Sequence, residues 1–125
     1  MKKTTLFLTL LCIYGLNAQI QISNLTYNSV ANSGPSKLQL FNNKIFFSAA
    51  NDGSGRELWS SDGTSSNTNL VKDINPGEEN GLGYFCSTIL NNNLFFVANE
   101  TNTYNGTGEI WKTDGTLLGT TLVTN

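Results

Sequence analysis

The hydrophobic positions of this chain fall in short runs that are separated by clusters of Gly, Asn, Asp and Ser. Residues 19–25 and 37–40 alternate between polar and apolar side chains, which is the period of a strand with one buried face. Residues 45–47 and 94–97 are apolar at consecutive positions, which favours strands that are covered on both faces. No long apolar stripe with helical spacing follows the first 18 residues. The pattern therefore predicts an all-β protein.

Turn-forming residues divide these runs at short intervals. Asn42-Asn43 stands between two apolar runs, and we expect a hairpin there because Asn tolerates positive φ. Residues 51–55 and 62–64 predict the next two turns, with a third strand over 56–61 and a fourth over 69–74. Four short strands in about 50 residues match the size of one β-propeller blade.

One motif is written twice. Residues 56–64 read Arg-Glu-Leu-Trp-Ser-Ser-Asp-Gly-Thr, and residues 108–116 read Gly-Glu-Ile-Trp-Lys-Thr-Asp-Gly-Thr. The flanking residues 40–49 also align with residues 89–98. A period of about 50 residues is typical of a solenoid or a propeller. The shared motif positions are Glu57, Leu58, Trp59, Asp62, Gly63 and Thr64 in the first copy, and Glu109, Ile110, Trp111, Asp114, Gly115 and Thr116 in the second.

This pattern resembles the bacterial ELWxxDGT repeat family, sometimes called hyalin-like repeats. The resemblance runs from about Leu38 to the C-terminus and includes Leu70-Val71-Lys72-Asp73-Ile74 after the first motif. It implies a secreted or surface-displayed β-repeat protein, and it implies no activity. The first copy has Asn67-Thr68 where the second has Gly119-Thr120, and this departure affects only a turn.

The first 18 residues have the features of a secretory signal peptide, which would form an N-terminal signal helix. Lys2 and Lys3 supply the positive start, residues 6–16 are an apolar run, and Ala18 precedes the expected cleavage before Gln19. A membrane anchor is disfavoured because a spanning helix needs about 20 apolar residues. We therefore expect secretion or display at the cell surface.

Lipidation of the leader is also disfavoured. Cys12 would be the lipidated residue, but Leu11 is large where that signal needs a small residue. After cleavage Cys86 would be the single cysteine, so no intramolecular disulfide is expected. Cys86 lies in an apolar run, and we interpret it as a small buried core residue.

Residues 19–125 are expected to form two repeats, at about 37–74 and 86–125, as an incomplete propeller. The strand predicted over residues 20–25 would then act as the extra strand that closes a propeller ring. Because the second copy stops inside its last strand, we interpret the sequence as the N-terminal piece of a longer protein or as a clipped reading frame.

The motif side chains have structural and functional interpretations. We expect Trp59 and Trp111 to fill the space between adjacent sheets, and Asp62 and Asp114 to accept N–H groups within their own turns. The glycine after each Asp is expected to take a positive φ. The alternative is that Trp59 is a sugar platform or that Asp62 is a metal ligand. The structural interpretation is preferred because a side chain that recurs in each copy has a role common to all copies, and that common role is packing.

Composition limits the chemistry. The chain has no His, which excludes a Ser-His-Asp set, a Cys-His pair and a His metal site. Glu57, Asp62, Glu109 and Asp114 are candidate glycosidase carboxylates by type, but each recurs at one place in its copy and is interpreted as structural. Calcium binding at residues 52–55 stays open, although the spacing of an EF-hand is lacking. We predict no catalytic residue and no cofactor.

Two functions remain. The first is a non-catalytic secreted or cell-surface scaffold for adhesion or protein–protein contact. The alternative is a carbohydrate-binding module or the propeller portion of an exported hydrolase. The expected partners are further repeats of a longer chain or other surface proteins, with glycans as a further option. A formal net charge of −2 argues against nucleic acid, and no membrane span is expected after signal cleavage.

Overall fold

The computed structural model describes residues 26–27, 31–83, 85–101 and 108–124. These residues form strands, turns and loops, and none of them is helical. The expected signal peptide, its helix and the strand predicted over 20–25 lie outside the described residues.

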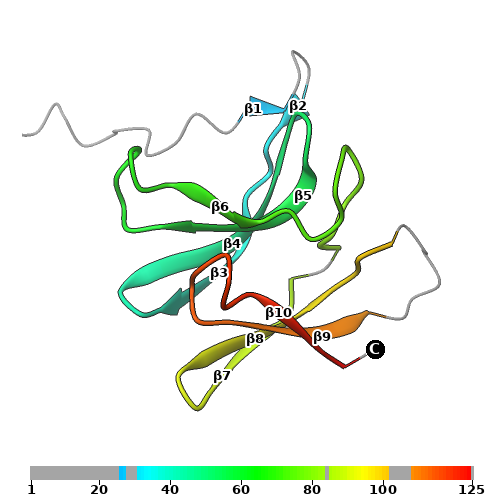
Figure 1. Ribbon diagram of the computed structural model, residues 1–125. Helices are drawn as coiled ribbons and strands as arrows, with labels where there is room; N and C mark the ends of the chain where they lie inside the picture. Colours follow the sequence, from blue (N-terminus) through cyan, green and yellow to red (C-terminus); the bar gives the residue numbers. More distant parts are fainter. Residues whose placement is uncertain (1–25, 28–30, 84, 102–107, 125) are drawn as a thin grey trace, which may run out of the picture.

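The first four-stranded sheet is an antiparallel meander in the order β3-β4-β5-β6 (Figure 1). Its strands are β3 (Ser36–Phe41), β4 (Lys44–Asn51), β5 (Gly55–Ser61) and β6 (Asn69–Lys72). A separate two-stranded hairpin precedes it, formed by β1 (Thr26–Tyr27) and β2 (Ala31–Asn32). The strands expected over 37–40, 56–61 and 69–74 are therefore present, with ends that differ by one or two residues.

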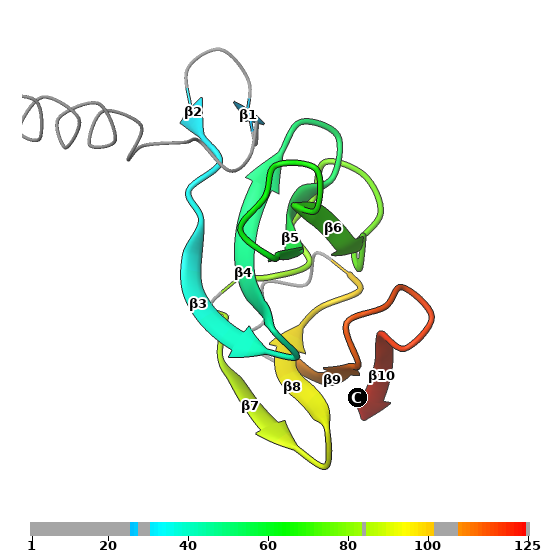
Figure 2. The same ribbon diagram turned by 90° about the vertical axis from the view of Figure 1, so that its left-hand side faces the viewer.

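The second sheet repeats this plan with the order β7-β8-β9-β10. Its strands are β7 (Ser87–Leu90), β8 (Asn93–Ala98), β9 (Glu109–Thr113) and β10 (Thr121–Thr124). Figure 2 shows this sheet lying below the first one, with the link after β6 running down to it. The prediction of an all-β chain built from antiparallel four-stranded sheets is confirmed.

Two Asn-Asn pairs form the tight turns of the β3-β4 and β7-β8 hairpins. Asn42 and Asn43 have φ of 47° and 59°, and Asn91 and Asn92 have φ of 48° and 57°. Two successive residues at positive φ define the turn whose twist matches that of the flanking strands. The hairpin predicted at Asn42-Asn43 is confirmed.

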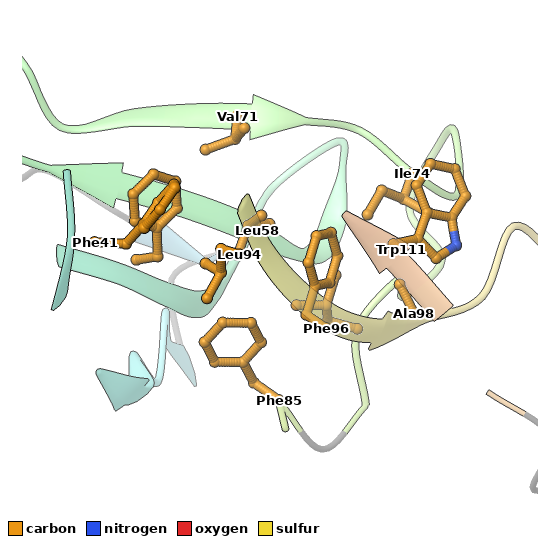
Figure 3. Packing of buried hydrophobic residues seen from close by; sticks show 11 residues of the cluster. Phe41, Leu58, Val71, Ile74, Phe85, Leu94, Phe96, Ala98 and Trp111 are labelled. Atoms are coloured by element: carbon orange, nitrogen blue, oxygen red, sulfur yellow. The ribbon is translucent and has the colours of Figure 1, made fainter. Parts of the chain in front are cut away.

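The main core lies between the two sheets (Figure 3). Phe41 and Phe46 of the first sheet are in tilted ring contact at 5.7 Å between centroids, and Phe85 and Phe96 of the second half pair at 6.2 Å. Burial of these apolar surfaces is the main stabilising contribution. The buried cluster consists of Phe41, Phe46, Leu58, Val71, Ile74, Leu82, Phe85, Leu94, Phe96, Ala98 and Trp111, with Leu122 packed against it.

The two central strands differ in how they are covered. On β4, Phe46 is buried toward the second sheet, while Phe47 is buried on the opposite face with Ala49 and Trp59. The expectation of a strand covered on both faces is confirmed there. On β8 the burial alternates, and Val97 is exposed. In the described structure, β8 is therefore fully covered on one face only, and its outer face carries the exposed Val97 and the half-buried Phe95.

The prediction of a buried Cys86 is also wrong. Cys86 is an exposed free cysteine, and its carbonyl accepts a hydrogen bond from Val97 N–H at 3.3 Å. It is Phe85 that enters the core. Neighbouring side chains in an extended segment point to opposite sides, so only one of the two can face the other sheet.

Candidate functional site

The two Asp-Gly-Thr turns have the same internal hydrogen bonds. Asp62 Oδ1 accepts from the backbone N–H of Thr64 at 3.0 Å and from its hydroxyl at 2.7 Å. Asp114 Oδ1 accepts the same pair of bonds from Thr116, both at 2.8 Å. Gly63 and Gly115 have φ of 97° and 99°. The predicted turn hydrogen bonds and the positive φ of both glycines are confirmed.

These hydrogen bonds also set the charge state of the two aspartates. The Thr64 hydroxyl and N–H groups lower the pKa of Asp62, and Asn67 adds to the effect. Thr116 lowers the pKa of Asp114 in the same way. Both carboxylates are thus held ionised by donors of their own turn.

One of the differences between the two turns changes how each turn is closed. Where the second copy has Gly119, the first has Asn67, whose side-chain amide donates to Asp62 Oδ2 at 2.7 Å. Gly119 instead donates its backbone N–H to the Thr116 hydroxyl at 2.9 Å. The first turn therefore uses a side chain for closure, and the second uses the backbone.

A pair of hydroxyls closes each turn, buried in the second copy and partly buried in the first, and the sequence did not predict it. Thr113 Oγ1 and Thr120 Oγ1 lie 2.7 Å apart, and Thr120 Oγ1 also donates to Thr116 O at 2.6 Å. In the first copy Ser61 Oγ and Thr68 Oγ1 lie 2.7 Å apart. A hydroxyl residue recurring at the same two places of each copy was the signal that could have revealed this pair.

Glu57 forms hydrogen bonds to the link, the segment 73–86 that connects β6 to β7. Its side chain is fully buried. Its carboxylate accepts backbone N–H groups from Gly81 at 2.6 Å, Ile74 at 3.1 Å and Asn75 at 3.4 Å. Burial raises the pKa of Glu57 to about 7, against the opposite effect of these three donors.

Gly81 is the point where the link meets both sheets. Its N–H donates to Glu57 on β5, and its carbonyl accepts from Asn99 N–H, just after β8, at 2.8 Å. A Cβ at residue 81 would collide with the Glu57 carboxylate. The next residue, Leu82, is fully buried and donates its N–H to Arg56 O at 2.9 Å.

The matching glutamate of the second copy has other neighbours. Glu109 is half-buried, and its Oε2 accepts from Glu100 N–H and from Trp111 Nε1, both at 3.4 Å. The structure therefore places Glu57 and Glu109 at equivalent strand positions but with different hydrogen-bond partners.

The two motif tryptophans also differ. Trp111 is buried between the sheets (Figure 3), and Lys72 Nζ lies 5.3 Å from its ring centroid. Lys72 Nζ also donates to Thr120 O at 3.0 Å, so one cation contacts both the ring and the backbone of the second sheet. The prediction that the ring fills the space between adjacent sheets is confirmed for Trp111.

Trp59 does not lie between the two four-stranded sheets, and for this ring the same expectation stays a prediction. It packs with Phe47, Ala49 and Leu70 on the face of the first sheet that points away from the second. Its Nε1 is buried without a hydrogen-bond partner in the described part of the chain. Because both indole rings are buried, neither offers an open face on which a sugar could stack.

The chemistry available to these residues is limited. Glu57 is buried and bonded to backbone N–H groups, while Asp62 and Asp114 are bonded within their turns. Among residues 31–83, 85–101 and 108–124, no three Asp, Glu, Cys or His side chains gather as metal ligands would. Within the same residues, no helix has the length and apolar character to cross a membrane.

These features define an antiparallel all-β protein of two stacked four-stranded sheets, with each Asp-Gly-Thr turn closed by its own side chains. No family model, curated protein or solved structure compared with the chain matches it. The similarity to ELWxxDGT repeats stays a prediction from the sequence.

Proposed function

We propose that this chain is a non-catalytic, secreted or cell-surface β-repeat scaffold for adhesion or protein–protein contact. Its two sheets would be consecutive blades of a β-propeller, and residues 1–18 would direct its export. Loops and sheet faces would contact the partner proteins, and the repeated motif would stabilise the fold.

The observation that carries the proposal is that the polar motif side chains bond to their own chain. Asp62, Asp114 and Glu57 accept hydrogen bonds from turn or link donors, and Trp111 is buried between the sheets. A reactive carboxylate must reach its substrate, and the Glu57 carboxylate is fully buried. Asp62 and Asp114 are exposed, but Oδ1 of each already accepts two hydrogen bonds within its own turn. The leader sequence and the similarity to surface-displayed repeats support the location.

The test is export of the full chain from a bacterial host, followed by intact-mass measurement of the released protein. We expect a mature chain that begins at or near Gln19. A retained Cys12 carrying a diacylglycerol would contradict release.

The same exported protein should be applied to a glycan array and to polysaccharide hydrolysis assays. The scaffold proposal expects neither glycan binding nor hydrolysis. Binding of a glycan that is lost on replacing an exposed loop residue, with an unchanged melting temperature, would favour the carbohydrate-binding alternative.

A further inference from the structure

The outer face of the second sheet repeats the face that the first sheet buries. Aligning the two copies pairs Phe41 with Leu90, Phe46 with Phe95, Leu58 with Ile110, and Val71 with Val123. Each pair is apolar in both copies. On the first sheet all four positions are almost inaccessible, with exposed fractions of 4% for Phe41, 0% for Phe46 and Leu58, and 7% for Val71.

Three of the four equivalent side chains of the second sheet are exposed, and the fourth, Phe95, is half-buried. Leu90 is 56% exposed, Ile110 is 44% exposed and Val123 is 47% exposed. The strand register places Ile110 opposite Val97, which is also exposed, so these side chains share the outer face. The same register places the exposed Lys112 opposite Phe95 on this side of the sheet. We name the apolar set Leu90, Phe95, Val97, Ile110 and Val123 the outer face.

The molecule itself shows what covers such a face. The corresponding face of the first sheet is covered by the Trp-bearing face of the second, through Leu94, Phe96, Ala98 and Trp111 (Figure 3). The Asp-Gly-Thr turn joins in, because Gly115 lies so close to the Phe46 ring that a Cβ there would be 3.2 Å from Cζ. The stacking is head to tail, since the two sheets contribute different faces to their contact.

We propose that the outer face is a docking surface for one further four-stranded sheet of this repeat, which would present its Trp-bearing face. The occupant would place its motif Trp over Ile110, as Trp111 lies over the first sheet, and its Asp-Gly-Thr glycine against Phe95. This inference deepens the proposed blade arrangement by naming the contact surface, and it does not depend on adhesion or export.

The decisive experiment adds such a sheet to the full chain. A copy of residues 73–124, which contains the link and the second sheet, is joined directly after Thr124. We expect a single cooperative unfolding transition and a melting temperature raised by more than about 5 °C, because the added sheet buries the outer face. An unchanged melting temperature would overturn the proposal.

Two matched variants identify the face. Ile110→Lys should shift the melting temperature of the original chain by no more than about 3 °C, since the site is partly exposed, yet it should remove the gain from the added sheet. Leu118→Lys is the control, because Leu118 is an exposed turn residue outside the outer face and the gain should persist. A gain that survives Ile110→Lys would show that the added sheet docks elsewhere.

If the extended chain aggregates, the original chain decides the question. An uncovered outer face should drive association that increases with concentration, and sedimentation velocity should show that Ile110→Lys reduces it. Association that Ile110→Lys leaves unchanged would overturn the proposal. The readouts are stability and association, so a failed glycan or export test would leave this result unaffected.

Discussion

At the scale of single residues, Glu57 is a carboxyl whose burial changes its pKa strongly. Burial raises its pKa from 4.5 to about 7, so the folded protein holds this proton more tightly than the unfolded chain does. A carboxyl with a raised folded pKa makes the protein most stable below its unfolded pKa, and this contribution is lost as the pH rises through the folded value. The relevant window is therefore pH 4.5 to about 7.

We predict that Glu57→Gln removes this pH dependence. The unfolding free energy of the unchanged protein should include a contribution that falls by roughly 3 kcal/mol across the window, and the variant should lack it. Denaturant titrations of both proteins at several pH values give the difference, in which the effects of other carboxyls cancel. Parallel curves would mean that folding does not raise the pKa of Glu57.

Asp114 should act in the opposite direction. Its folded pKa is lowered by the Thr116 donors, so its contribution is present above the ordinary pKa of Asp and is lost as the pH falls through the lowered value. We predict that Asp114→Ala lowers the melting temperature at neutral pH and speeds hydrogen exchange of the Thr116 amide. Asp114→Asn keeps an acceptor oxygen and should preserve most of the protection. Equal protection in the Ala variant would show that the turn does not need the side chain.

At the scale of elements, the packing of β9 against the first sheet depends on Trp111. We predict that Trp111→Ala lowers the unfolding free energy by about 3–5 kcal/mol, because it leaves a cavity between the sheets and removes the ring beneath Lys72. The neighbouring Ile110→Ala is the control and should cost less than about 1 kcal/mol, since that side chain is partly exposed. Thermal or denaturant unfolding measures both, and equal losses would contradict a core position for Trp111.

Local features of this fold could be predicted from the sequence. The Asn42-Asn43 turn and the Asp62-Thr64 hydrogen bonds depend on residues that are close in the chain, and both follow from known side-chain preferences. Long-range features could not be predicted in this way. The bond from Gly81 to Glu57 spans 24 residues and depends on how the link folds back. The sequence pattern also does not predict which of Phe85 and Cys86 faces the other sheet, because both orientations of this extended segment would bury an apolar side chain.

At the scale of the whole molecule, the two sheets have the same strand order but different neighbours. The motif positions are equivalent in sequence, but Trp59 lies on the face that points away from the second sheet while Trp111 lies between the sheets. A repeated motif predicts equivalent strands, and the neighbours of each strand depend on its place in the stack. This difference explains why one copy alone could not reveal the role of either tryptophan.

The hydrogen bonds from the link to the Glu57 carboxylate also constrain the geometry between the sheets. The carboxylate of one sheet fixes Ile74 and Gly81 of the segment that leads to the next, and Gly81 in turn is bonded to Asn99. The tilt and the displacement between the two sheets are therefore constrained by bonds from one segment to both of them. Where a further unit carried the same bonds, the same step would recur, so curvature would arise along the chain and would not require a closed ring to impose it.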